Sequence, residues 1–266
     1  MKRVWIFVLA LLITLASFAG AQAKSSLVDE VMKRGVLKVG MDIFVPWSFK
    51  DKNGNLVGFE VDVARKLAQD MGVKAEFVPT AWAGIIPSLL TGKFDVIIGG
   101  MGITTERAIK VNFTIPYEEG GQDVVVNKKM LPKVSGFQDL NKESIVISVH
   151  MGATPVAAAK KYFPKAQLHQ FDNDPAVIQD VLNGNAHAAI SSSPTPAFWA
   201  SDYPDKLYRP FGGQLITFEP GSFALRKGDP EAIFFFNAWI TTSRDYLKER
   251  FDYWFGTKDW KDMIAE

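Results

Sequence analysis

The sequence predicts an α/β protein of two lobes, each a mainly parallel sheet flanked by helices. Segments with the two-residue period of a strand alternate with segments that have the period of a helix, which is typical of parallel sheets covered by helices. This alternation is interrupted over residues 112–122 and then starts again, which indicates a domain boundary. After removal of a predicted leader, 243 residues remain (266 − 23), enough for two domains of ordinary size.

Residues 1–23 have the three parts of a secretory signal peptide: the basic Met1-Lys2-Arg3, an apolar segment over residues 4–18, and small residues ending at Ala23. The apolar segment is short for a membrane span and no charged stop-transfer segment follows, which favours a cleaved leader over an anchor. The chain has no cysteine, so neither disulfides nor a lipidated first residue are expected. The sequence therefore predicts a free periplasmic protein, not a lipoprotein.

The charge balance argues against a nucleic-acid partner. Cleavage after Ala23 leaves 28 Lys and Arg (30 − 2) against 29 Asp and Glu, a net charge of −1. Nucleic-acid binding requires a basic face or stripe, which a nearly neutral chain does not suggest.

The first unit begins with a helical segment and a strand, and continues in βα alternation. We expect helices over 25–34, 61–71 and 83–90 and strands over 35–42 and 75–80, with an aromatic loop over 44–49 and a turn over 51–55.

The stretch over residues 95–107 predicts an anion site. Val96 to Ile98 form an apolar strand, and the glycines at 99, 100 and 102 remove side chains where a ligand could approach the backbone. Thr104 is expected to cap a helix, which places Arg107 beside free N–H groups suited to a carboxylate. The alternative is an ordinary tight turn with a solvated arginine. Neither a dinucleotide loop nor a P-loop fits the spacing.

The second unit repeats this pattern. We expect strands over 123–127, 144–149, 167–171 and 186–191, with helices starting at Pro155 and Pro175. Thr154 before Pro155 is a preferred helix start, so a second strand–Gly–Thr–helix turn could face the first across a cleft. The alternative is an ordinary capped helix.

The C-terminal part is expected to return to the first unit. Residues 216–221 look like a second crossing and residues 222–226 like a strand, and the aromatic residues after Pro230 have the helical spacing of core packing.

Catalytic and metal-binding patterns are missing from the sequence. The three histidines have no metal-ligand spacing, there is no Gly-x-Ser-x-Gly motif, and Ser191-Ser192-Ser193 fits a polar turn. We therefore expect no catalytic residue, metal or cofactor. Phe44, Trp47 and Trp82 lie in loops after strands, where α/β proteins hold ligands, although such residues also cover cores.

Several motifs resemble the periplasmic solute-binding proteins of amino-acid ABC importers (solute-binding protein family 3), which include the glutamine-, histidine- and arginine-binding proteins. They are Gly58-Phe-Glu-Val-Asp-Val-Ala64, Trp82-Ala-Gly-Ile-Ile-Pro-Ser-Leu89, Gly92-Lys-Phe-Asp-Val-Ile-Ile98, Ile103-Thr-Thr-Glu-Arg107 and Phe113-Thr-Ile-Pro-Tyr117. The likeness implies a type II periplasmic-binding-protein fold and a monomeric receptor that closes like a clamp and delivers a small carboxylate, an amino acid or close analogue, to an inner-membrane permease.

The resemblance also implies lobe boundaries and site residues. Lobe 1 would comprise 24–119 and 219–266 and lobe 2 residues 120–218, with hinges near 117–122 and 216–221. Phe44 and Trp82 would sandwich the ligand, Arg107 would hold its carboxylate, and His150 would read its side chain. Further contacts would come from Gly100, Met101, Gly102, Ala153, Thr154 and Ser192.

Two positions depart from the family pattern. Ser192 stands where an aspartate usually binds the α-ammonium, and Gly102 stands where many members have a hydroxyl side chain. Either Asp42 or Glu219 compensates, or the ligand is an organic acid without an α-ammonium.

The family includes cyclohexadienyl dehydratases, which act on prephenate or arogenate, and this is the enzymatic alternative. Their catalytic glutamate corresponds to Thr195 here, so the proton donor that elimination needs is not found. We therefore expect a receptor and not an enzyme.

Overall fold

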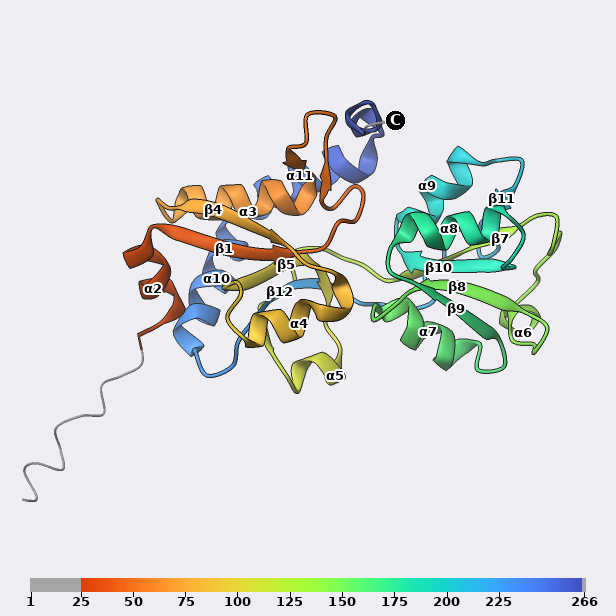
Figure 1. The fold of residues 1–266 in the computed structure, drawn as a ribbon, viewed down its shortest axis with the longest axis horizontal. Helices are drawn as coiled ribbons and strands as arrows, with labels where there is room; N and C mark the ends of the chain where they lie inside the picture. Colours follow the sequence, from red (N-terminus) through yellow and green to blue (C-terminus); the bar gives the residue numbers. More distant parts are fainter. Residues whose placement is uncertain (1–24, 265–266) are drawn as a thin grey trace, which may run out of the picture.

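The computed structural model describes residues 25–264, so the predicted leader lies outside the described residues. Figure 1 shows two lobes side by side, joined by two passages of chain. Each lobe contains a five-stranded sheet with helices on its faces, and the sheets share no strand. The predicted two-lobed α/β architecture is confirmed.

The first lobe contains the sheet β4-β1-β5-β12-β6. In chain order its elements are α2 (Leu27–Arg34), β1 (Val36–Met41), β2 (Phe49–Lys50), β3 (Leu56–Val57), α3 (Phe59–Asp70), β4 (Lys74–Pro79), α4 (Trp82–Leu90), β5 (Val96–Gly102), α5 (Thr105–Ala108), β6 (Asn112–Phe113), β12 (Gly221–Leu225), α10 (Pro230–Thr242), α11 (Arg244–Gly256) and a 3-10 helix (Asp259–Met263).

The second lobe contains the sheet β11-β7-β10-β8-β9. Its elements are β7 (Gln122–Asn127), α6 (Phe137–Leu140), β8 (Val146–His150), α7 (Thr154–Tyr162), β9 (Gln167–Phe171), α8 (Asp174–Leu182), β10 (Ala188–Ser192), α9 (Thr195–Asp202) and β11 (Leu207–Tyr208).

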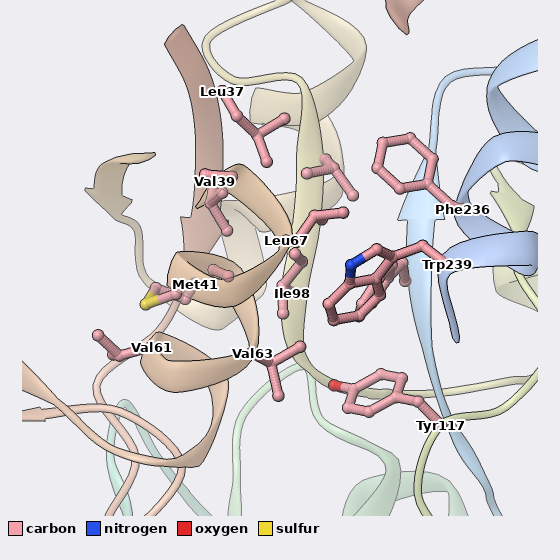
Figure 2. Packing of buried hydrophobic residues seen from close by; sticks show 14 of the residues in the cluster. Leu37, Val39, Met41, Val61, Val63, Leu67, Ile98, Tyr117, Phe236 and Trp239 are labelled. Carbon is pink, nitrogen blue, oxygen red and sulfur yellow. The ribbon is translucent and has the colours of Figure 1, made fainter. Parts of the chain in front are cut away.

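The alternation of side chains along β5 explains how the first lobe is layered. Val96 and Ile98 face a core shared with α3, α10 and α11, whereas Ile97 faces a second core formed with α4. Figure 2 shows the first of these cores, where Leu67 of α3 and Trp239 of α10 lie around β5. Most C-terminal aromatic residues therefore belong to the core or pack against it, as predicted, whereas Phe234 is 74% exposed and Tyr246 is not part of this cluster.

Both sheets are mixed, which qualifies the expectation of mainly parallel pairing. In the first sheet β1 pairs in parallel with β4 and β5, but β12 runs antiparallel to β5 and β6. In the second, β8 is parallel to β9 and β10, while β7 is antiparallel to β10 and β11. In each sheet the antiparallel partner is a strand next to a crossing between the lobes.

The glycine-rich segment after Ile98 differs from the predicted turn. β5 continues to Gly102 because the returning strand β12 pairs with its end, Gly221 opposite Gly102 and Ser222 opposite Met101. A partner strand contributed from far along the chain thus extends β5, and local glycine content did not reveal it. The small hairpin of β2 and β3 was also not predicted.

The two crossings run beside each other and are hydrogen-bonded together. Glu219 N donates to Gly120 O at 2.8 Å, and Ile216 N donates to Gln122 O at 2.8 Å. Gln122 N also donates to the hydroxyl of Thr217 at 2.9 Å. The two crossings are therefore fixed to each other by hydrogen bonds, and they carry the side chains of Gln122 and Glu219 at the base of the cleft. No helix within residues 25–264 combines the length and apolar character that a bilayer span requires.

Candidate functional site

A cavity lies between the lobes and is lined by residues of both. Its lining includes the carboxylates of Asp42 and Asp174 and the serines Ser191 and Ser192. Nine of the ten predicted ligand-binding residues line it: Phe44, Trp82, Gly100, Gly102, Arg107, His150, Ala153, Thr154 and Ser192.

Met101 is the exception among the predicted residues. Its side chain is fully buried in the core beneath α4, with Ile85 and Phe94, and it does not line the cavity. Because side chains alternate along β5, Gly100 and Gly102 lie on the cleft side of the strand while Met101 points away. Only the backbone of Met101 remains a candidate for ligand contact.

The turn after β5 positions Arg107. Thr104 caps α5, as predicted, since its hydroxyl accepts a hydrogen bond from Arg107 N at 3.2 Å. The guanidinium donates from Nη1 to Gly102 O at 3.0 Å and lies 5.6 Å from the centre of the Trp82 ring. α5 is only four residues long, so the guanidinium and not a helix dipole supplies the positive charge here.

Burial lowers the pKa of Arg107, and the charges of Glu219 and Glu106 oppose that shift. An arginine side chain nevertheless stays protonated in proteins. Within residues 25–264 its guanidinium donates a hydrogen bond only to Gly102 O, which leaves most of its five N–H donors available. This arrangement suits a carboxylate bound by two parallel hydrogen bonds.

The backbone N–H of Gly100 is already used. It donates to the hydroxyl of Tyr117 at 3.1 Å, and that hydroxyl donates to Glu60 Oε1 at 2.6 Å. Gly100 adopts φ +64°, and a Cβ there would lie 3.0 Å from Trp47 Nε1. Gly100 is therefore required for the fit of the loop around Trp47, and its N–H is not available to a ligand.

Two carboxyl groups lie beside this loop: Glu60 is fully buried and Glu118 is half-buried. Burial raises the pKa of Glu118 to about 8, opposed by a hydrogen bond from Trp47. Burial also raises the pKa of Glu60, and the charge of Glu118 adds to that shift. The protonation of Glu60 therefore depends on the charge of Glu118, which lies where the first crossing begins.

The aromatic residues line the cavity in two places. Phe44 stacks on Trp47 with ring centroids 4.3 Å apart and planes within 1° of parallel. Trp82 begins α4, beside the guanidinium of Arg107. That Phe44 and Trp82 enclose a ligand between them stays a prediction.

Thr154 does not cap its helix, contrary to expectation. The N-cap position of α7 is Ala153, and no side chain caps this helix. The Thr154 hydroxyl instead accepts a hydrogen bond from Gln122 Nε2 at 2.9 Å. Because Pro155 already presets the first helical turn, the threonine hydroxyl is free to face the base of the cleft.

His150 connects three elements. Its Nδ1 lies 2.8 Å from Asp174 Oδ2, and its Nε2 lies 3.7 Å from Asp42 Oδ2 in the opposite lobe. Burial alone would lower the pKa of His150, but the hydrogen bond and charge of Asp174 together with the charge of Asp42 raise it. Protonated His150 therefore attracts a carboxylate from each lobe.

Asp42 is held by other partners as well. Its Oδ1 accepts from Ile43 N at 2.7 Å and its Oδ2 accepts from Trp82 N at 3.1 Å. Burial raises the pKa of Asp42, opposed by these N–H groups and by His150.

Sequence reasoning missed Gln122 and Asp174. Asp174 directly precedes the predicted helix start at Pro175 and was not among the predicted site residues, although it accepts a hydrogen bond from Ser191 at 2.7 Å and pairs with His150. Gln122 was assigned to the end of the crossing, and its polar side chain at the start of a buried strand was the available signal. Among the described residues no group of three or more acidic or histidine side chains is arranged to hold a metal ion.

Comparison with known proteins identifies the family. Residues 37–257 match the family model described as bacterial extracellular solute-binding proteins, family 3. The match covers most of the chain and both lobes.

Solved structures and a curated relative agree with this match. The ancestral amino acid-binding protein AncCDT-1, described as a precursor of cyclohexadienyl dehydratase, is 43% identical, with a TM-score of 0.79 over 87% of this chain and 100% of its own. A second structure is the binding component of an ABC transporter from Wolinella succinogenes DSM 1740 in complex with lysine. It is 37% identical to this chain, with a TM-score of 0.80 over 86% of this chain and 99% of its own. The cyclohexadienyl dehydratase of Pseudomonas aeruginosa is 27% identical over 70% of this chain and 69% of its own length.

Proposed function

Since this chain belongs to family 3 of the bacterial extracellular solute-binding proteins, we propose that it is the substrate-binding receptor of an ABC importer for an amino acid or close analogue. The ligand binds between the lobes, the lobes close on it, and the loaded receptor delivers it to an inner-membrane permease. The predicted leader over residues 1–23 and the lack of cysteine support a free periplasmic protein, and we propose that it acts as a monomer.

The observation that carries this proposal is Arg107. A half-buried guanidinium that lines the cleft and has a single backbone acceptor within the described residues keeps N–H donors available for an anionic ligand. Gly102 and Thr154 from opposite lobes lie around it in the same cavity. The proposed lobe boundaries, 24–119 with 219–266 and 120–218, place Arg107 in lobe 1 and Thr154 in lobe 2.

We also propose that the protein is not an enzyme. The position that corresponds to the catalytic glutamate of the dehydratases is Thr195, which is 4% exposed at the start of α9. The similarity to a dehydratase and to its amino acid-binding precursor makes prephenate turnover the competing function.

A ligand screen tests both parts. The protein is unfolded and refolded to remove bound ligand, and its thermal unfolding is followed with each of the common amino acids, with α-keto acids and with prephenate. An amino acid at 100 times its Kd adds about 2.7 kcal/mol to the free energy of unfolding. For a chain of this size the midpoint then rises by roughly 5–10 °C.

Two outcomes would contradict the proposal. If no small carboxylate raises the unfolding midpoint, the chain is not a receptor for such ligands. If prephenate is converted to phenylpyruvate by the purified protein, followed by absorbance, the chain is an enzyme on the same fold.

A further inference from the structure

Glu219 lies at the base of the cleft among polar groups of both lobes. It belongs to the second crossing, and its Oε2 accepts a hydrogen bond from Gln122 Nε2 at 3.1 Å. The same amide nitrogen lies 2.9 Å from the Thr154 hydroxyl and 3.4 Å from the Ser192 hydroxyl. Glu219 and Ser192 thus share one neighbour and line one cavity with Gly102.

Two acceptor atoms of this cluster remain without a partner among the described residues. Gln122 is 2% exposed, and its Oε1 has no hydrogen-bond partner. The second carboxylate oxygen of Glu219, Oε1, likewise accepts no hydrogen bond from residues 25–264, whereas Oε2 accepts one from Gln122. A buried amide oxygen without a donor is costly, so this cluster is complete only when a hydrogen-bond donor joins it.

The negative charge of Glu219 acts on the guanidinium of Arg107. Burial lowers the pKa of Arg107 and the charge of Glu219 opposes that shift, yet the two side chains form no ion pair within 4.0 Å. A zwitterionic amino acid carries its carboxylate and ammonium on the same carbon. Its two anchors must therefore be close, opposite in charge and not paired with each other. Arg107 and Glu219 are opposite in charge and unpaired with each other, and both lie against Gly102: Arg107 Nη1 donates to Gly102 O at 3.0 Å, and a Cβ at 102 would lie 3.5 Å from Glu219 Oε2.

Gly102 provides the room for Glu219. A Cβ at Gly102 would lie 3.2 Å from Glu219 Cβ and 3.5 Å from Glu219 Oε2, tighter than ordinary contact at the first distance. The Glu219 backbone is fixed as well, because its N–H donates to Gly120 O at 2.8 Å. Glycine at position 102 therefore leaves the space that the Glu219 side chain occupies.

Asp42 does not occupy an equivalent place. Its carboxylate is held by the N–H groups of Ile43 and Trp82, and it faces His150. Asp42 is not among the charges that act on Arg107. Asp42 lines the main cavity with Ser192, but of the two carboxylates only Glu219 shares a hydrogen-bond neighbour, Gln122 Nε2, with Ser192.

We propose that Glu219 binds the α-ammonium of the ligand, assisted by the Gln122 amide oxygen and the Ser192 hydroxyl, and that it makes the site selective for α-amino acids over acids that lack the amino group. This inference rests on the proposed receptor function. It assigns the ammonium anchor to the second crossing between the lobes, where closure brings it toward the ligand.

The test compares ligands that differ only in the α-amino group. L-Lysine is paired with 6-aminohexanoate, which lacks that group, and L-arginine with 5-guanidinopentanoate. Of these two amino acids, the one that binds more tightly to the refolded protein is used with its partner. Binding to wild type, Glu219→Gln and Gly102→Ser is measured by calorimetry, and circular dichroism verifies that each variant is folded.

Wild type is expected to bind the amino acid at least about 30-fold more tightly than its partner, since an unpaired buried charge is expensive to leave in the complex. Glu219→Gln should weaken binding of the amino acid by about 30-fold or more. It should change the affinity for the analogue that lacks the amino group by less than about threefold. Gly102→Ser should shift selectivity in the same direction, because its side chain displaces the Glu219 carboxylate.

Two control variants make the result specific. Glu106→Gln removes the other carboxylate that acts on Arg107, one that is 84% exposed and lines neither the cavity of Arg107 nor that of Glu219, and should leave both affinities unchanged. Asp42→Asn should leave the ratio between the paired ligands within about threefold of wild type, because its carboxylate is committed to other groups.

The proposal is overturned if Glu219→Gln weakens both ligands by the same factor, if it weakens neither, or if wild type does not distinguish them. In each of these cases the amino acid still binds, so the receptor function stands. If wild type binds neither lysine nor arginine but does bind 6-aminohexanoate or 5-guanidinopentanoate, the ligand lacks an α-ammonium and this inference fails alone. If none of the four binds, the assignment of Glu219 fails, and the wider ligand screen decides whether the receptor function fails with it.

Discussion

The two strand-to-helix turns that face the cleft look alike in sequence but differ in what they contribute. In both, glycine and threonine follow a strand and precede a helix. After β5, Thr104 caps the helix and Arg107 supplies a fixed positive charge. After β8, Thr154 leaves the cap position and its hydroxyl pairs with Gln122, so this turn offers neutral hydrogen bonding.

The difference follows from the residue after each threonine. Thr104 precedes an ordinary turn whose N–H groups need a side-chain acceptor, whereas Thr154 precedes Pro155, which has no N–H and already fixes its own backbone. A matching sequence outline therefore predicts the position of a turn more safely than the role of its side chains. The lobe-1 turn provides the charge, and the lobe-2 turn provides shape and neutral contacts.

The largest expected effect is the loss of that charge. Arg107→Ala should weaken binding of the amino acid by about 30-fold or more, whereas Thr154→Ala should weaken it by no more than about 10-fold, since a charged pair is worth more than a neutral hydrogen bond. Calorimetric titration of the refolded variants measures both.

Arg65→Ala is the matched control for this comparison. Arg65 likewise donates to one backbone carbonyl and lies 5.6 Å from an aromatic ring centre, that of Phe77, but it is on the outer surface of lobe 1. Its removal should leave affinity unchanged. Equal losses at Arg107 and Thr154 would contradict the division between a charged and a neutral turn.

The second turn should be sensitive to shape. Gly152 adopts φ +73°, and a Cβ there would lie 3.1 Å from Ala83 Cα in the opposite lobe. Gly152→Ala should therefore hinder closure and weaken ligand binding by about 10-fold, which corresponds to about 1.4 kcal/mol. It should also lower stability by about 1–2 kcal/mol through backbone strain alone.

Gly184→Ala separates these two effects. Gly184 has a similar φ of +78°, but the nearest atom to its Cβ is Met130 Sδ at 3.9 Å within the same lobe. Both variants should lose similar stability in chemical denaturation, and only Gly152→Ala should lose affinity. If Gly184→Ala weakened binding as much, strain and not lobe contact would be responsible.

The capping difference predicts that the two threonines contribute unequally to the free energy of unfolding. Thr104→Ala removes a side-chain cap and should lower the free energy of unfolding by about 1 kcal/mol. Thr154→Ala removes no cap, and Gln122 Nε2 keeps Ser192 and Glu219 as acceptors, so the change should be below about 0.5 kcal/mol. Urea denaturation without ligand measures both, and a larger loss at Thr154 would contradict the assignment of caps.

The fold, and most of the predicted residues that line the cavity, could be identified from the sequence because they depend on local patterns and motif order. Strand and helix periods placed β1, α3 and β4 correctly, and Arg107 was identified from its place after a capped turn. Contacts between segments far apart in sequence could not be predicted in this way. The extension of β5 requires β12, and the place of Glu219 beside Ser192 requires two crossings paired by hydrogen bonds.

The second turn also differs from the first in carrying a titratable charge, on His150 at its start. Asp174 and Asp42 face this ring and raise its pKa in the folded protein, against the effect of burial. A raised folded-state pKa stabilises the protein fully below the unfolded-state value of about 6.5, and this contribution is lost as pH rises through the folded-state pKa. The stability difference between wild type and His150→Asn should therefore be larger at pH 5.5 than at pH 8.5, measured by urea denaturation.

His187 provides a control of opposite sign on the same lobe. Burial lowers the pKa of His187, so protonation opposes folding there, and the advantage of wild type over His187→Asn should grow as pH rises. Both substitutions remove a ring that takes part in a hydrogen bond, His187 accepting from Val146 N at 3.1 Å. The stability difference between wild type and variant should fall with pH for His150→Asn and rise with pH for His187→Asn. The same pH trend in both variants would therefore indicate a general effect on the lobe. It would contradict a stabilising positive charge on His150 between Asp42 and Asp174.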